Sequence, residues 1–199
     1  MNTQKPRVVV TGSTGAVGRQ VCSRLAEEGY HVLGLDRRSG ISLNPEVTLQ
    51  TVDLAVADLR TLLTGADIVV HLASGVQAHD VEEDPGHNML AVAERLLAAA
   101  DTAGVTHFVI RSSAMVYGAW EDNPVPLTED AEIRPCPGFR FAEHRAALEK
   151  IAREWAEKNK KRSVSVLRTA VTVGEERPGG LARVLESAKN IRTEEGDPM

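Results

Sequence analysis

The sequence is poor in the residues that mark disulfide-rich, membrane-spanning or nucleic-acid-binding proteins. Its 199 residues include two cysteines, Cys22 and Cys136, which are too few for a disulfide framework or a cysteine metal cluster. The net charge is -5, so no basic excess favours nucleic acid. No apolar run is long enough to cross a bilayer, and no signal-peptide pattern opens the chain. We therefore expect a cytoplasmic protein without a bound metal, acting on neither nucleic acid nor a membrane.

A glycine-rich turn near the N-terminus is the most informative stretch. Val8–Val10 reads as a buried strand, and a helix opens inside the glycines that follow. Gly12 permits a tight turn, Gly15 lets the backbone approach a diphosphate, and Gly18 lets helix and strand pack closely. The helix N-terminus offers free N–H groups to an anion. The residues expected to hold the diphosphate are Gly12, Thr14, Gly15, Ala16, Val17 and Gly18.

An acid follows the glycines at the distance that dinucleotide binding requires. The second predicted strand, 30–35, is followed directly by Asp36, which is placed to accept hydrogen bonds from a ribose diol. Its charge also repels a 2′-phosphate, which favours NAD. Arg37 and Arg38 follow. If they bind that phosphate, they favour NADP, whereas in a solvated loop they would not affect the choice of cofactor. We expect NAD, with NADP as the alternative.

The remaining pattern predicts one doubly wound α/β domain over residues 1–199. Strands alternate with amphipathic helices, which is typical of a Rossmann-type parallel sheet in the order 3-2-1-4-5-6, covered by helices on both faces. The predicted strands after the second are 47–52, 67–73, 107–111 and 164–170. The predicted helices are one ending near residue 28 with Gly29 as its stop, then 57–63, 87–103, 140–158 and 181–189.

Two motifs resemble the extended short-chain dehydrogenase/reductases, the NAD-dependent epimerase/dehydratase group. One is the spacing Gly12-x-x-Gly15-x-x-Gly18 followed by Asp36, and the other is the run Ser112-Ser113-Ala114-Met115-Val116-Tyr117-Gly118. The resemblance implies that Ser113 is catalytic and hydrogen-bonds a substrate hydroxyl or carbonyl. It also implies further cofactor contacts at Asp53, Leu54, Leu72, Ala73, Ser74 and Ser112. Asn88 resembles an asparagine that the family keeps near the start of the helix at 87–103.

The chain departs from this family at its proton-transfer pair. The family carries Tyr-x-x-x-Lys on a helix, and the match of Glu149 to a family glutamate sets Phe141 at the tyrosine position and Arg145 at the lysine position. Phenylalanine has no exchangeable proton, and arginine stays protonated, although it still donates hydrogen bonds to ribose. We therefore expect Phe141 and Arg145 to border the cofactor without moving a proton.

Two side chains are candidate replacements for the missing proton donor. His144 lies about one helical turn past Phe141, and its ordinary pKa suits proton transfer near neutral pH. The alternative is that His144 is a surface residue of an amphipathic helix. Tyr117 belongs to the serine motif and is the second candidate, whereas Glu143 faces away.

The last part of the chain matches the family incompletely. Arg168 and Gly174 fit a family pattern in which Val171 stands where an asparagine would contact substrate. Family members usually continue into a small C-terminal substrate domain, which is absent or truncated here, so the chain is either a shortened relative or part of a longer protein.

Two functions remain open on these grounds. One is an NAD(P)-dependent oxidoreductase or nucleotide-sugar epimerase/dehydratase-like enzyme acting on an unidentified small molecule. The other is a catalytically inactive dinucleotide-binding module with a sensing or structural role. The resemblance also implies a homodimer through the helices at 87–103 and 140–158.

Overall fold

The computed structural model describes residues 5–73 and 89–170. The predictions for Ser74, Asn88, Val171, Gly174 and the helix at 181–189 lie outside these residues. The chain divides into two units, and the first ends at Thr169.

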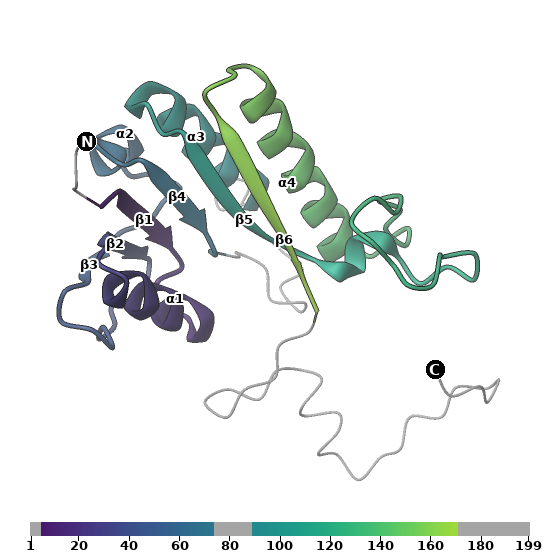
Figure 1. Ribbon diagram of the computed structural model, residues 1–199, viewed down its shortest axis with the longest axis horizontal. Helices are drawn as coiled ribbons and strands as arrows, with labels where there is room; N and C mark the ends of the chain where they lie inside the picture. Colours follow the sequence, from purple (N-terminus) through teal and green to yellow (C-terminus); the bar gives the residue numbers. More distant parts are fainter. Residues whose placement is uncertain (1–4, 74–88, 171–199) are drawn as a thin grey trace, which may run out of the picture. The chain divides into compact units, whose positions relative to one another are not determined.

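Six parallel strands form one sheet in the order β3-β2-β1-β4-β5-β6, as the sequence predicts (Figure 1). The strands are β1 (Arg7–Thr11), β2 (His31–Asp36), β3 (Thr48–Thr51), β4 (Ile68–His71), β5 (His107–Ser113) and β6 (Ser163–Thr169). The chain order reverses beside β1, which pairs with β2 on one side and β4 on the other. In sheets of this kind ligands bind at that reversal, outside the carboxyl ends of the strands.

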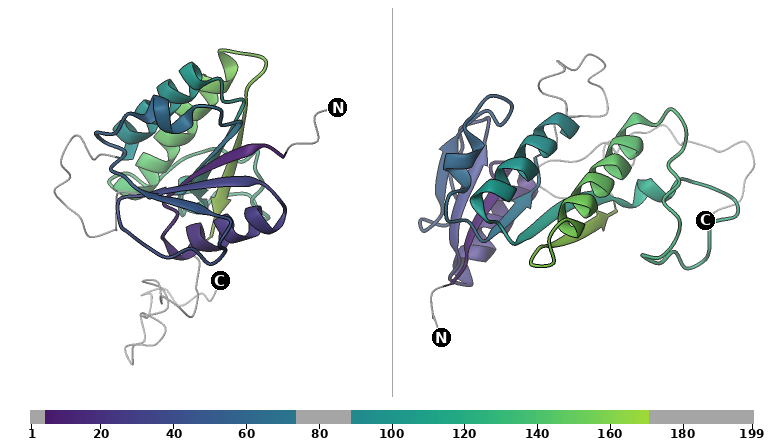
Figure 2. Two further views of the ribbon diagram at one scale, coloured as in Figure 1. Left: turned by 90° about the vertical axis from the view of Figure 1, so that its left-hand side faces the viewer. Right: turned by 90° about the horizontal axis from the view of Figure 1, so that it is seen from above.

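Helices cover both faces of the sheet. They are α1 (Ala16–Glu27), α2 (Leu59–Leu63), α3 (Met89–Ala103) and α4 (Arg140–Glu157), and a short 3-10 helix, η2 (Ala114–Tyr117), follows β5. The left view of Figure 2 shows α1 on one side of the sheet and the other three α-helices on the opposite side. No helix in the described ranges is long and apolar enough to span a membrane.

Alternate residues of each strand feed two separate cores, as the two-residue period of a strand requires. Val9, Val69 and Phe108 pack in the core beneath α2, α3 and α4, while Val8 and Val10 pack with Cys22 against α1. Cys22 is 1% exposed, and burial raises the pKa of its thiol to about 11.

Element boundaries differ from the predicted ones by a few residues. Helix α2 begins at Leu59 rather than residue 57, because the Asp58 side chain accepts a hydrogen bond from Thr61 N and caps the helix there. Strand β5 runs to Ser113 rather than residue 111, because its last two residues still pair with β6. Gly29 ends α1 as predicted, with φ +83° and a hydrogen bond from its N–H to Ala26 O.

Candidate functional site

The glycine turn between β1 and α1 is built so that no side chain fits inside it. A Cβ on Gly18 would lie 2.1 Å from Gly12 O, and one on Gly12 would lie 2.7 Å from Ala73 N. Gly12 also has φ +72°, in the left-handed region. The turn therefore depends on glycine at both positions for close packing of α1 against β1 and β4.

The start of α1 is open to an anion. Its N-cap residue, Gly15, provides no side-chain hydrogen bond, so the first N–H groups of the helix, those of Ala16, Val17 and Gly18, have no partner of that kind. A Cβ on Gly15 would meet only Gly12 O, at 3.3 Å, which leaves its outer side free for close approach. A diphosphate fits this cradle, because its oxygens complement the N–H groups and the positive end of the helix dipole.

Asp36 lies at the end of β2 and contacts the same turn. Its carboxylate accepts hydrogen bonds of 3.0 Å from Thr14 N and from Arg38 N. Partial burial opposes ionisation of Asp36, but the hydrogen bonds from Arg38 and Thr14 outweigh it and lower the pKa. Asp36 is therefore ionised at neutral pH, which suits it to accept ribose hydroxyls and to repel a phosphate.

The two arginines after Asp36 extend outward. Arg37 is exposed, and the Arg38 guanidinium lies 3.9 Å from the Asp36 carboxylate with 59% of its side chain exposed. The turn is also approached by Gly40, where an added Cβ would lie 2.7 Å from Thr14 Cγ2. The loop after β2 thus packs on the glycine turn, which the sequence pattern did not indicate.

Polar groups at the ends of β1 and β4 are linked across the two strands. Thr11 Oγ1 lies 2.8 Å from His71 Nδ1 and accepts a hydrogen bond of 3.3 Å from Ala73 N. His71 is 1% exposed, and desolvation with the charge of Arg145 lowers its pKa to about 4, so the ring is neutral at pH 7. Its Nε2 atom is buried and has no hydrogen-bond partner among residues 5–73 and 89–170.

The other expected cofactor contacts lie near strand ends. Asp53 and Leu54 follow β3, and Leu54 is buried in the core under α3. Leu72 and Ala73 follow β4, where Leu72 N donates to Thr11 O. Their roles toward a cofactor stay predictions.

The two serines of the serine motif have different hydrogen-bond partners. Ser113 caps η2, with its hydroxyl accepting a 3.3 Å hydrogen bond from Met115 N. Ser112 points to the α4 side, where its hydroxyl donates to the buried carboxylate of Glu149. Ser113 therefore keeps its hydroxyl hydrogen available for a ligand, whereas that of Ser112 is already used.

Phe141 and Arg145 are in direct contact. The Arg145 guanidinium carbon lies 5.1 Å from the centre of the Phe141 ring, and Nη1 donates a 2.7 Å hydrogen bond to Arg111 O. Arg145 is 3% exposed, and its Nε has no hydrogen-bond partner in the described part of the chain. The two side chains thus form a cation–π contact that is held at the end of β5, and their correspondence to the family's tyrosine and lysine stays a prediction.

The two candidate proton donors have different surroundings. The Tyr117 hydroxyl accepts a 2.6 Å hydrogen bond from Arg168 Nη1, which ties it to β6. His144 is partly buried, and its Nδ1 is shielded from solvent with no hydrogen-bond partner in the described ranges. Both roles stay predictions, and the available ring nitrogen makes His144 the better placed of the two.

Sequence reasoning missed a buried network that holds α4, β6 and η2 together. The Glu149 carboxylate is 1% exposed and accepts a 2.8 Å hydrogen bond from Arg168 Nη2. Arg168 Nη1 also donates to Glu129 O in the loop after η2. Glu149 and Arg168 are 19 residues apart in the sequence, and no local pattern links them. The one available signal was that Glu149 falls on the buried face of α4, where a carboxylate needs a partner.

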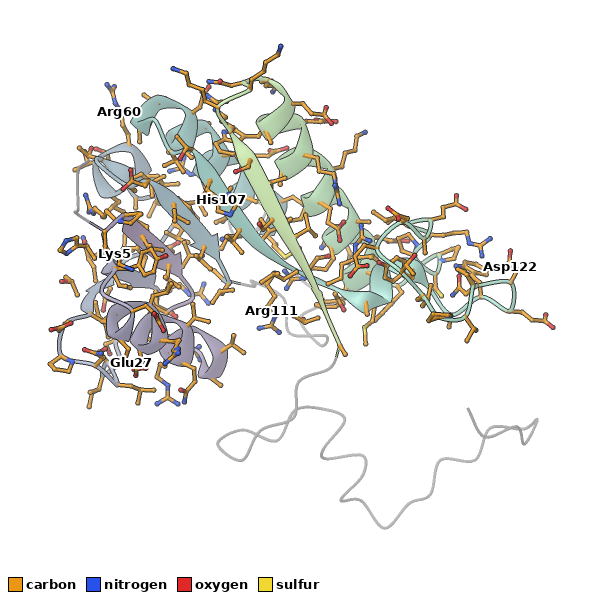
Figure 3. All side chains as sticks on the ribbon, in the orientation of Figure 1. Lys5, Glu27, Arg60, His107, Arg111 and Asp122 are labelled. Atoms are coloured by element: carbon orange, nitrogen blue, oxygen red, sulfur yellow. The ribbon has the colours of Figure 1, made fainter. Side chains whose placement is uncertain are left out.

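The loop between η2 and α4 is shaped by its own side chains. Trp120 Nε1 donates a 2.6 Å hydrogen bond to Arg134 O, and the Arg134 guanidinium lies over the Trp120 ring and pairs with Asp122. Figure 3 shows Asp122 at the outer part of this loop. In the part of the chain that the structure describes, no group of three His, Cys, Asp or Glu side chains is arranged to hold a metal ion.

Comparison with known proteins identifies relatives by sequence. The chain is 32% identical over 148 residues to an uncharacterized UDP-glucose epimerase, YtcB, of Bacillus subtilis, covering 65% of this chain and 46% of the relative. It is 30% identical over 142 residues to a UDP-glucose 4-epimerase of Corynebacterium glutamicum, covering 67% and 42% respectively. The chain thus spans less than half the length of these curated relatives.

A solved structure supports the same grouping. MoeE5 in complex with UDP-glucuronic acid and NAD superimposes with a TM-score of 0.69 at 28% identity, over 81% of this chain and 54% of that one. The family model described as NAD dependent epimerase/dehydratase family matches residues 8–196. Because this match covers most of the chain, the chain belongs to the NAD-dependent epimerase/dehydratase family.

Proposed function

We propose that this chain binds NAD through the glycine turn and Asp36, and that it is an oxidoreductase or nucleotide-sugar epimerase/dehydratase-like protein. The observation that carries the proposal is the contact between the Asp36 carboxylate and Thr14 N, which joins the ribose-binding acid to the diphosphate cradle. Two solved relatives at 27–28% identity contain NAD, which supports the same cofactor. The ionised Asp36 favours NAD over NADP.

In such a site the protein's own groups orient ligands and donate hydrogen bonds. When bound, NAD supplies hydride acceptance and return at its nicotinamide ring. Ser113 would hydrogen-bond the substrate, and Arg145 would fix the nicotinamide side of the site. Proton movement would fall to His144, because Phe141 has no proton to give.

A second candidate is a dinucleotide-binding module without turnover. The contact between Phe141 and Arg145 favours it, because neither side chain can exchange a proton at neutral pH. A general acid or base contributes about 10² to 10⁴ in rate, so its loss would leave little activity.

One experiment separates the two candidates. NAD-dependent conversion of UDP-glucose would be measured for the wild type, for His144→Ala, and for a Phe141→Tyr/Arg145→Lys double variant that restores the family pair. The enzyme proposal predicts turnover by the wild type that His144→Ala abolishes without changing NAD affinity. Turnover seen only in the double variant would instead support the binding module.

The remaining expectations are part of the same proposal. The substrate would be a small molecule of the nucleotide-sugar class, in keeping with the named activities of the curated relatives. A cytoplasmic location and a homodimer through α3 and α4 stay predictions, and size-exclusion chromatography with light scattering would test the second.

A further inference from the structure

Arg145 is a buried cation whose surroundings do not balance its charge. It is 3% exposed, and within the described part of the chain its partners are neutral: the Phe141 ring and the carbonyl oxygen of Arg111. Burial and the charge of Arg111 both lower its pKa, to about 10, and no carboxylate counters them within the described residues. Burying an unpaired charge is costly, so such an arrangement needs a compensating function.

Among the described residues, two buried nitrogen atoms have no hydrogen-bond partner: Arg145 Nε and His71 Nε2. Both residues lie at the ends of β4 and β5, because Arg145 Nη1 donates to Arg111 O and His71 pairs with Ile110, the residue before Arg111. Thr11 Oγ1 occupies the other ring nitrogen of His71, so Nε2 is the nitrogen left for a ligand. Figure 3 places Arg111 at the lower end of β5, toward the carboxyl ends of the strands.

We propose that Arg145, with Arg111 and His71, forms an oxyanion-binding site at the carboxyl ends of β4 and β5. The group bound is a carboxylate or phosphate of the ligand. Guanidinium groups bind such planar or tetrahedral oxyanions with charge-assisted hydrogen bonds, and a site with low exposure strengthens them. The Phe141 ring holds the guanidinium in place in a way that a flexible lysine ammonium would not reproduce.

The anion site itself does not require the proposed function, so it is tested first with inorganic phosphate. Thermal unfolding of the full chain would be followed at rising phosphate, with total ionic strength held constant by chloride. Phosphate should stabilise the wild type, and its apparent affinity should fall about ten- to a hundredfold in Arg145→Met, as expected for lost charged hydrogen bonds.

Matched variants make the result specific. Lys150→Met removes a charge from the same helix at a side chain that is 77% exposed, and it should bind phosphate like the wild type. Arg111→Met and Arg145→Lys should weaken binding less than Arg145→Met does, and they carry the test if that variant fails to fold. Equal phosphate affinity in the wild type and all three arginine variants would overturn the proposal.

A second arm identifies the source of the oxyanion and rests on the proposed function. UDP-glucuronic acid and UDP-glucose differ by one carboxylate and would be titrated in the presence of NAD. A preference for the carboxylate-bearing sugar that disappears in Arg145→Met assigns the site to the sugar. Equal affinities, with the phosphate effect intact, assign it to a phosphate group. Failure of NAD to bind, with the phosphate effect intact, would reject the proposed function and leave the anion site standing.

Discussion

At the scale of single residues, the glycine turn shows how steric limits create a binding site. Gly12 and Gly18 approach backbone atoms so closely that even a methyl group would have to displace the chain. Gly104 is a useful contrast, because its φ is +80° but no atom lies within 4 Å of an added Cβ. The first two glycines are needed for packing, whereas the third is needed only for its backbone conformation.

Gly18→Ala should therefore weaken both folding and cofactor binding. The added methyl group would force the turn apart at Gly12 O, at a cost of about 1–3 kcal/mol in unfolding free energy. Gly104→Ala should cost about 1–2 kcal/mol through left-handed strain alone and leave NAD affinity intact. Denaturant unfolding and NADH fluorescence measure the two effects, and equal NAD affinity in both variants would count against the proposed cradle.

Asp36→Ala should reduce NAD affinity about ten- to a hundredfold, since it removes the acceptor for the ribose hydroxyls. Asp58→Ala is the matched control, because it deletes the same group from the N-cap of α2. That variant should lose about 1 kcal/mol of stability and keep its NAD affinity. Similar NAD affinities for the two variants would exclude Asp36 from the site.

His71 should make the fold sensitive to mild acid. Its pKa in the folded protein, about 4, is lower than its ordinary value, so the folded state favours the neutral ring. The stabilisation is complete above about pH 6.5 and is lost as the pH falls toward 4, amounting to about 3 kcal/mol. Urea unfolding between pH 7 and pH 4 should show this loss in the wild type, and His71→Gln should flatten the dependence.

At the scale of elements, the Glu149–Arg168 pair links α4 to β6 inside the protein. Removing one partner leaves the other buried and charged, so Glu149→Ala should destabilise the fold by about 3–5 kcal/mol. Glu154→Ala breaks an exposed pair with Lys150 at 4.0 Å on the same helix and should cost less than about 1 kcal/mol. Similar losses in chemical denaturation would show that the buried pair contributes little.

The helices and strands were largely predictable, because the spacing of apolar residues and the positions of glycines can be read from the local sequence. The valines of β1 and the apolar face of α1 are examples, and Gly29 ends α1 as expected. Boundaries were less accurate where tertiary contacts decide them. Ser112 and Ser113 belong to β5 only because β6 pairs with them, and no local pattern shows that pairing.

The candidate site was predictable in part. The glycines of the turn and Asp36 are recognisable from the sequence, because they come into contact within one strand–helix–strand unit and so stand at a characteristic spacing. The packing of the loop at Gly40 and the contact of Arg145 with Arg111 O were not predictable. Each contact joins two segments that no fixed number of residues separates in the sequence. Gly34 could have been noticed, because a glycine inside a strand often marks close approach, here by Ser13.

At the scale of the whole molecule, the fold brings the diphosphate cradle, Asp36 and the Phe141–Arg145 pair to the carboxyl ends of one parallel sheet. Strand order brings the glycine turn and Asp36 together, because β1, β2 and β4 are neighbours around the reversal. The hydrogen bond from Arg145 Nη1 to Arg111 O holds the Phe141–Arg145 pair of α4 at the end of β5. Under our proposal this edge of the sheet is a dinucleotide site in which a cation against an aromatic ring stands where the family has its proton-transfer pair.

Isothermal titration calorimetry of the full chain with NAD tests this most directly. The account predicts saturable binding at one site per chain in the wild type and in Phe141→Tyr, with the heat greatly reduced in Gly18→Ala and Asp36→Ala. An absence of binding heat in the folded wild type, or undiminished binding in both site variants, would contradict it.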